Sequence, residues 1–183
     1  MKYTIIIITV FCLSLSDLFA QNHHSDFNVY MTYSHSFGLR EKNVIWNLNR
    51  NDGLYANSFH IKGMYRIYEF FSCGIGFGAD ALRQPRYTTF PIYASIQFNP
   101  IYYSNWFLYN NIGYSLNSNI SYPGLHYEAG IGYQWKFKKH FGIFLNAGYT
   151  LKQMQNIKIQ YENKTELANT TRQSLFTGFG FIF

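Results

Sequence analysis

The sequence FGIFLNAGYTLK, residues 141–152, alternates between two sets of side chains. The apolar set is Phe141, Ile143, Leu145, Ala147, Tyr149 and Leu151, and the other, mostly small or polar, is Gly142, Phe144, Asn146, Gly148, Thr150 and Lys152. A period of two residues predicts a β-strand, because successive side chains of a strand point to opposite faces. This stretch therefore predicts a strand with one apolar and one more polar face.

The same pattern recurs along the chain after Asp26, as about eleven residues of alternation followed by a connection. We predict strands near residues 26–38, 54–65, 71–81, 88–98, 106–117, 125–137, 141–152 and 173–183. Residues 44–46 and 157–161 are also strand-like, and we interpret them as hairpin extensions beyond the membrane. The prediction is thus eight strands, with ten as the alternative.

Charged residues are separated by face in all of these segments. No Lys, Arg, Asp or Glu falls on the apolar faces, whereas Lys62, Asp80, Glu128 and Lys136 fall on the opposite faces. An Arg or Lys that faces lipid at the bilayer midplane costs about 2–4 kcal/mol. Eleven residues at about 3.3 Å each, tilted by roughly 40°, rise by about 27 Å, close to the apolar band of roughly 25 Å in membrane barrels. The pattern predicts an all-β fold, an antiparallel up-and-down transmembrane β-barrel.

The composition agrees with a membrane location. Charged residues make up only 13% of the chain, against roughly a quarter in soluble domains. Hydrophobic residues reach 48%, yet the mean hydropathy is −0.17, as expected where apolar and polar residues alternate. The net charge of +6 is not arranged in a basic stripe or a nucleic-acid-binding motif. We therefore expect an anionic membrane surface, and not nucleic acid, as the partner.

The first twenty residues are typical of an export signal. Lys2 provides a positive charge, residues 3–13 form an apolar run, and Ala20 provides a small residue for cleavage. We predict that residues 1–20 are a cleaved signal peptide and that residues 21–183 form one outer-membrane β-barrel domain. Removal of Cys12 with the signal would leave Cys73 as the single cysteine, so no internal disulfide is expected.

The connections are predicted to alternate in length. The short ones lie near 66–70, 99–105 and 138–140, and the mostly longer ones near 39–53, 82–87, 118–124 and 153–172. Short turns on one side and long loops on the other are typical of transmembrane barrels, and an even strand number places both termini on the short-turn, periplasmic side.

Two residues fit the pattern poorly. Asn110 falls on the expected lipid face, and Pro91 lacks the N–H that a continuous ladder uses. We expect a bulge or a change of register near these positions.

The last segment, LFTGFGFIF at residues 175–183, resembles the carboxy-terminal signal that outer-membrane barrels present to their insertion machinery. Glycines and aromatic residues also alternate at 74–78, 113–114 and 130–133. Nearly the whole mature chain is similar to the small eight-stranded barrels that include the OmpA membrane domain and OmpX-like and OmpW-like proteins. The resemblance implies that the insertion machinery binds the strand ending in Phe183. The glycines are expected to leave room inside the barrel for aromatic neighbours.

The interior of an eight-stranded barrel is just wide enough to be filled by side chains. The predicted inward residues are Asn28, Tyr30, Thr32, Ser34, His60, Lys62, Ser72, Asp80, Tyr93, Gln97, Tyr109, Asn111, Glu128, Gln134 and Asn146. We predict a polar plug in which these groups satisfy one another, since buried charges need partners. Glu128 paired with Lys62 or His60 is one arrangement of this kind.

No catalytic, cofactor-binding or metal site is predicted. Residues 126–130 resemble the His-x-Ser-Asn segment of lipid A deacylases, but Glu128 stands where the nucleophilic serine should be. Palmitoyl-transferring barrels begin with an amphipathic helix, whereas residues 21–25 form a short polar lead. His23 and His24 precede Asp26 without a spaced further ligand, which favours a solvated segment over a metal site.

The expected longer loops are basic. They contain Arg40, Lys42, Arg50, Arg83, Arg86, Lys158, Lys164 and Arg172, together with Trp46 and Tyr161. We expect these residues to keep the loops soluble or to contact lipopolysaccharide phosphates or an envelope protein partner. The leading hypothesis is a non-enzymatic outer-membrane protein that acts in envelope structure or surface interaction. The alternatives are an OmpW-like narrow channel for small solutes and a lipid A modifying enzyme.

Overall fold

A computed structural model of the chain describes residues 27–43, 49–50, 54–83, 87–100, 105–117, 120–138, 141–161 and 164–183. The strands are β1 (Phe27–Asn43), β2 (Asn49–Arg50), β3 (Tyr55–Tyr68), β4 (Phe71–Leu82), β5 (Tyr87–Phe98), β6 (Trp106–Asn117), β7 (Ile120–Lys138), β8 (Phe141–Tyr161) and β9 (Lys164–Ile182). Among these residues, no helix is long and apolar enough to span a membrane. The predicted signal peptide at 1–20 lies outside the described residues.

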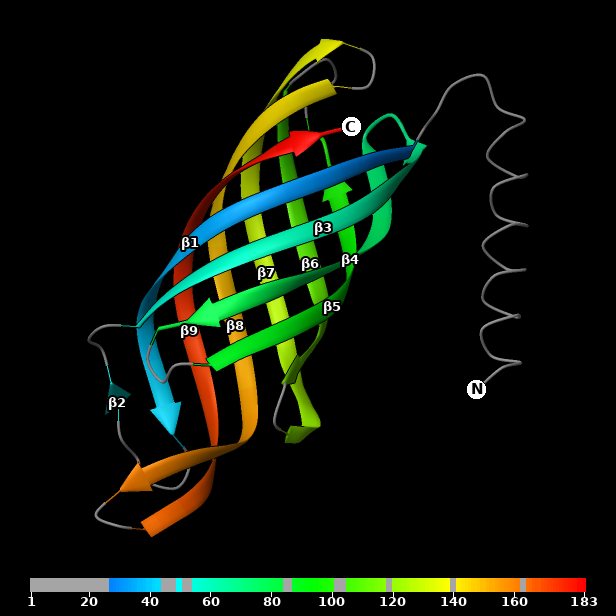
Figure 1. Ribbon diagram of the computed structural model, residues 1–183. Coiled ribbons are helices and arrows are strands. Elements are labelled where there is room, and N and C mark those ends of the chain that lie inside the picture. The colour runs from blue at the N-terminus through cyan, green and yellow to red at the C-terminus, as the bar shows by residue number, and fades with distance from the viewer. Residues whose placement is uncertain are drawn as a thin grey trace, which may run out of the picture.

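Eight strands close into an antiparallel barrel (Figure 1). Strands β3 to β8 each pair with the next strand, β1 pairs with β3, and β9 closes the barrel by pairing with β1. Reciprocal backbone hydrogen bonds of 2.8 and 2.9 Å between Val29 and Phe183 extend the closing seam. The two-residue β2 pairs only with the part of β1 that extends beyond β3. The eight-strand prediction is confirmed, and the ten-strand alternative is wrong.

The start of the first barrel strand, β1, and the end of the last, β9, both lie on the short-turn side of the barrel (Figure 1). Strand β3 ends at Tyr68 and β4 begins at Phe71, and β7 ends at Lys138 and β8 begins at Phe141. These turns lie at the same end as the start of β1 and the finish of β9, which we call the terminus end. We call the opposite end the loop end.

The predicted long connections at 118–124 and 153–172 are largely wrong, because β7, β8 and β9 continue through them. At the loop end the β8–β9 ladder runs on to the pair Tyr161 and Lys164 and projects past the other strands (Figure 1). Backbone hydrogen bonds pair the two strands of this ladder along its length. The predicted hairpin extension at 157–161 is confirmed, and residues 44–46 lie outside the described residues.

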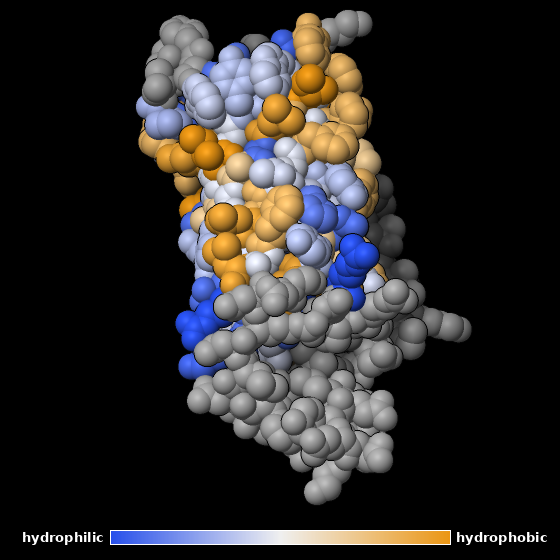
Figure 2. Space-filling view, turned by 90° about the vertical axis from the view of Figure 1, so that its left-hand side faces the viewer, coloured by the Kyte–Doolittle hydropathy of each residue, from blue (hydrophilic) through white to orange (hydrophobic). Residues whose placement is uncertain are grey.

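The two faces of the barrel have opposite character. The outer face exposes apolar side chains, among them Ile75 at 75% and Phe77 at 60%, whereas Asp80 and His126 on the inner face are fully buried. Figure 2 shows hydrophobic residues spread over the barrel, with most strongly hydrophilic ones in its lower half. Soluble proteins rarely expose an apolar surface of this extent, so this surface faces lipid and the barrel spans a membrane.

The two poorly fitting residues are accommodated without a bulge, so that expectation is wrong. Asn110 lies on the outer face and donates a hydrogen bond of 3.1 Å to the hydroxyl of Tyr127. Beside Pro91 the β4–β5 ladder lacks two pairs, but its register is the same before and after the gap. On its other side Pro91 pairs with Ser115 in an unbroken ladder. One missing N–H thus interrupts the pairing without shifting it.

Candidate functional site

The barrel interior near the terminus end is filled by apolar and aromatic side chains. The cluster comprises Tyr30, Met64, Phe107, Tyr109, Phe144, Phe176 and Ile182, all buried. Facing glycines make room for the rings: a Cβ at Gly132 would lie 2.2 Å from the Phe107 ring, and one at Gly180 would lie 2.5 Å from the Phe144 ring. The expectation that inward glycines accommodate aromatic neighbours is confirmed.

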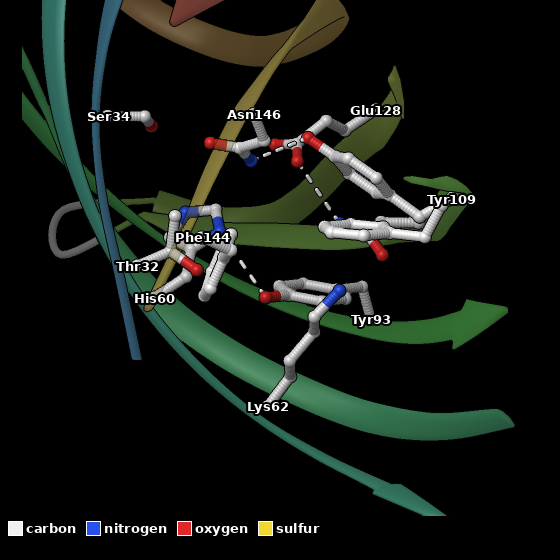
Figure 3. Close-up of a pocket in the computed structure, with 11 residues that line it drawn as sticks. Thr32, Ser34, His60, Lys62, Tyr93, Tyr109, Glu128, Phe144 and Asn146 are labelled. Atoms are coloured by element: carbon white, nitrogen blue, oxygen red, sulfur yellow. Dashed lines mark hydrogen bonds between the residues drawn. The ribbon is translucent and has the colours of Figure 1, made fainter. Parts of the chain in front are cut away.

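Beside this cluster lies a cavity of about 10 Å³ (Figure 3). A volume of this size holds about one water molecule. The Lys62 ammonium faces the cavity and lies 4.8 Å from the ring centre of Tyr109 and 5.1 Å from that of Tyr30, close enough for cation–π attraction. Glu128 accepts a hydrogen bond of 3.2 Å from Asn111. The Tyr109 hydroxyl accepts one of 2.8 Å from Asn146.

The loop-side half of the interior is organised around the carboxylate of Asp80, which is fully buried. Its Oδ2 lies 2.8 Å from Nζ of Lys152, and its Oδ1 lies 3.0 Å from Nε2 of His60. Thr89 adds a longer hydrogen bond of 3.4 Å to Oδ2. The other ring nitrogen of His60 is 3.3 Å from the Tyr93 hydroxyl (Figure 3). A buried carboxylate needs such partners, because desolvation alone would make its charge costly.

These contacts correct one sequence expectation. Among the described residues, Glu128 forms no ion pair with Lys62 or His60. His60 is held by Asp80 from the neighbouring strand, and Lys62 lies over aromatic rings. Pairing across a barrel depends on the stagger between non-adjacent strands, which the sequence pattern does not specify.

His126 lies against the Asp80 cluster without joining it. Its ring is fully buried, with its centre 5.9 Å from that of His60 and 5.6 Å from that of Tyr93. Neither ring nitrogen has a hydrogen-bond partner among the described residues. The histidine of the deacylase-like segment is therefore enclosed within the barrel wall and its filling.

The His60–Asp80 pair resembles the base and orienting acid of a hydrolase, which also needs a nucleophile and an open substrate site. The position of the nucleophile is occupied by the phenol of Tyr93. The buried hydroxyls of Ser95 and Ser115 form no hydrogen bond within the described part of the chain. No three metal-ligating side chains are grouped there either. The geometry among the described residues holds a buried charge.

Arg172 corrects the predicted set of basic loop residues. It lies in β9, is only 2% exposed, and faces the barrel interior. Its Nε donates a hydrogen bond of 2.7 Å to Oε2 of Glu41, and its Nη2 contacts the same oxygen. Because Arg172 has the same parity as the buried Ser174, extending the alternation by two residues would have placed it inside.

The remaining basic residues are distributed as follows. Arg40, Lys42 and Arg83 are exposed at the loop end. The structure describes the backbone but not the side chains of Arg50, Lys158, Tyr161 and Lys164. Arg86, Trp46, His23 and His24 lie outside the described residues.

Between the two ends of the barrel, and apart from Arg66 and Lys136 at the terminus end, the described charges on the inner face balance. The carboxylates are Glu41, Asp80 and Glu128, and the cations between the two ends are Lys62, Lys152 and Arg172. Sequence alternation placed Lys152 on the correct face but gave no reason to pair it with Asp80, which lies four strands away, on the opposite side of the barrel. The sequence analysis also did not identify Glu41 as the partner of Arg172 or Thr89 as a partner of Asp80.

The chain matches no protein-family model and no curated protein sequence. Several solved structures are similar to it. Neisserial surface protein A (NspA) has 18% identity and a TM-score of 0.48, covering 84% of this chain and 96% of its own. Ail, the attachment invasion locus protein of Yersinia pestis, has 15% identity and a TM-score of 0.47, covering 86% and 97%. The outer membrane protein OprG from Pseudomonas aeruginosa has 11% identity and a TM-score of 0.43, covering 89% and 98%. At these identities the likeness concerns the fold alone.

Proposed function

We propose that this chain is a non-enzymatic integral outer-membrane protein with a plugged interior, and that it acts in envelope structure or surface contact through its loop end. The observation that carries the proposal is the filling of the interior among the described residues, where an apolar cluster and a buried ion network border a cavity of about 10 Å³. A solute would have to displace both layers. The exposed cations at the loop end are the groups left for contact with a partner.

The electrical conductance of the purified protein in a bilayer tests whether the barrel interior is plugged. Purified, folded protein is added to planar bilayers at several salt concentrations, and the current is recorded under applied voltage. A plugged barrel gives no steady, discrete conductance steps. Steps that recur at a fixed amplitude would contradict the plug and favour the narrow channel for small solutes.

Lipid A chemistry tests the absence of enzymatic activity. The chain is expressed in the outer membrane of a Gram-negative host, and lipid A is extracted and weighed by mass spectrometry. We expect the same mass spectrum as with an empty vector. A new lipid A species that disappears in the variant His60→Gln would identify an enzyme.

The loop-end cations are proposed to bind lipopolysaccharide phosphates. Arg40, Lys42 and Arg83 are exposed next to an aromatic cluster in which the ring centres of His35 and Phe37 are 4.7 Å apart. Cations bind phosphate with a strong dependence on salt, while aromatic side chains favour the membrane interface. Replacing the three cations with glutamine should weaken lipopolysaccharide binding and flatten its salt dependence. The matched control replaces Arg66 and Lys136 at the terminus end, and an equal loss in both variants would refute the assignment.

The terminus end is proposed to face the periplasm, with the C-terminal strand serving as the signal for the insertion machinery. In a Cys73→Ser background, Arg83→Cys should react with a membrane-impermeant maleimide in intact cells. Glu69→Cys, at the opposite end, should react only after the outer membrane is permeabilised. The reverse pattern would invert the topology. Phe183→Ala should slow assembly without changing the stability of barrels that have already folded.

A further inference from the structure

The cavity of about 10 Å³ lies between two buried side chains of opposite charge. Lys62 on β3 and Glu128 on β7 both line it, from strands on opposite sides of the barrel. In Figure 3 the two side chains approach the cavity from opposite sides. They are too far apart to form an ion pair, although the charge of Glu128 acts on Lys62. Each buried charge therefore needs other partners, because leaving it unpaired would be costly.

The Lys62 ammonium has aromatic neighbours but no hydrogen-bond acceptor among the described residues. Its nitrogen lies 5.1 Å from the ring centre of Tyr30 and 4.8 Å from that of Tyr109. The rings attract the positive charge, but an ammonium carries three N–H donors, which hydrogen-bond best to oxygen. At least one donor is left for an oxygen atom inside the cavity that Lys62 lines.

The opposite wall of the cavity presents acceptors. Glu128 accepts a hydrogen bond of 3.2 Å from Asn111 and is also a partner of the Tyr109 hydroxyl. A carboxylate can accept about four hydrogen bonds, so further lone pairs remain. The Oδ1 atom of Asn111, which also lines the cavity, is buried and has no hydrogen-bond partner in the described part of the chain. A molecule in the cavity would thus meet a donor on one side and acceptors on the other.

Size and charge restrict what this cavity can hold. A volume of about 10 Å³ corresponds to about one water molecule. Glu128 would repel an anion and Lys62 would repel a cation, and the two charges together cancel. The ligand that matches these walls is a neutral molecule that both accepts and donates hydrogen bonds. Water meets all of these conditions at this volume.

We propose that the cavity binds one ordered water molecule that joins Lys62 to Glu128. The water oxygen accepts a hydrogen bond from the Lys62 ammonium, and one of the water hydrogens is donated to the Glu128 carboxylate. The second hydrogen is available to Oδ1 of Asn111. The two charges thereby form a solvent-separated ion pair that ties β3 to β7 across the barrel. This site is independent of any contact at the loop end.

Crystal structures of the folded protein in detergent, at a resolution that shows ordered waters, test this site. Diffraction data collected at a long wavelength distinguish water from chloride by the anomalous signal of chlorine. Ser34→Val places an additional methyl group at the cavity wall. Ser36→Val, its control, makes the same change on the same face of β1 but away from the cavity. Urea titration in lipid vesicles compares the stability of the variants, and heat-modifiable migration on a gel verifies that each is folded.

We expect one density peak within hydrogen-bond distance of both Lys62 and Glu128, without an anomalous signal. The peak should be lost in Ser34→Val and kept in Ser36→Val. Ser34→Val should also have the lower urea midpoint, because both charges lose a hydrogen bond. Lys62→Met and Glu128→Gln should each lower the midpoint more than the double variant does, since either change alone strands a buried charge. A direct contact between Lys62 and Glu128, an anomalous peak in the cavity, or equal midpoints for the two serine variants would overturn the proposal.

Discussion

The two halves of the barrel interior are filled by different means. Near the terminus end, Met64, Phe107 and Phe144 pack as an apolar cluster against inward glycines. Toward the loop end, Asp80 holds Lys152 and His60 in a buried ionic cluster. An apolar cluster loses stability in proportion to the volume removed, whereas an ionic cluster loses most when one partner is left without its counter-charge. The two halves should therefore respond differently to single and paired substitutions.

The largest effect is expected for Asp80→Ala. The substitution leaves the Lys152 ammonium buried beside His60 without a carboxylate, which should lower the free energy of unfolding by about 3–5 kcal/mol. Urea titration in lipid vesicles, followed by tryptophan fluorescence, measures the change. Adding Lys152→Met removes the stranded charge and should recover most of the loss. If the double variant is as unstable as the single one, the cluster does not act as an ion pair.

Met64→Ala tests the apolar half and should be somewhat milder. Met64 is 1% exposed, and truncating a buried methionine costs about 2–5 kcal/mol, depending on how far the surroundings close the cavity. Met64→Leu keeps most of the volume and should cost less than about 1.5 kcal/mol. The same titration compares the two variants. Equal destabilisation by Ala and Leu would show that volume does not control this half.

Gly132→Ala introduces the opposite defect, an excess of volume. The new methyl group would lie 2.2 Å from the Phe107 ring, which must move. Such overpacking costs about 1–3 kcal/mol. The temperature at which the heat-modifiable band disappears gives a simple measurement. Because Phe107→Leu removes the ring edge, it should reduce the penalty of Gly132→Ala, and additive losses would contradict the contact.

The smallest effect is expected for Thr89→Val. The hydroxyl of Thr89 makes only a long hydrogen bond to Asp80, at 3.4 Å, so its removal should cost about 0.5–1.5 kcal/mol. Thr88→Val, on the outer face of the same strand, is the matched control and should be neutral or stabilising in lipid. A loss above 3 kcal/mol for Thr89→Val would mean that this bond is central to the cluster.

The fold and the two faces of each strand could be predicted from the sequence because the side-chain period of a strand is local. The inward positions of Glu128, Asp80 and Lys62 follow from counting along single strands, and all three are buried. The boundaries of β8 and β9 were less predictable. Beyond the membrane the outer face no longer has to be apolar, so the pattern fades while the backbone ladder continues to Tyr161.

The partners inside the barrel could not be predicted in the same way. Which residues meet across the interior depends on strand tilt and stagger, which are properties of the closed sheet. Asp80 therefore pairs with Lys152, a contact that the sequence did not predict. The suggested pair of Glu128 with Lys62 does not form among the described residues. Arg172 was misplaced for a different reason, because the predicted last strand began at residue 173, and its inward parity with Ser174 was therefore not applied to it.

The seam between β1 and β9 also constrains the order in which the molecule can form. It joins residues as far apart in sequence as Val29 and Phe183, so closure requires the loop with the largest entropic cost in the chain. Until β9 arrives, β1 has an unpaired edge in a strand with an apolar face, the kind of edge that pairs with other chains. Synthesis from the N-terminus therefore produces the aggregation-prone edge first and its partner last. The unpaired edge of β1 therefore needs protection until β9 has formed.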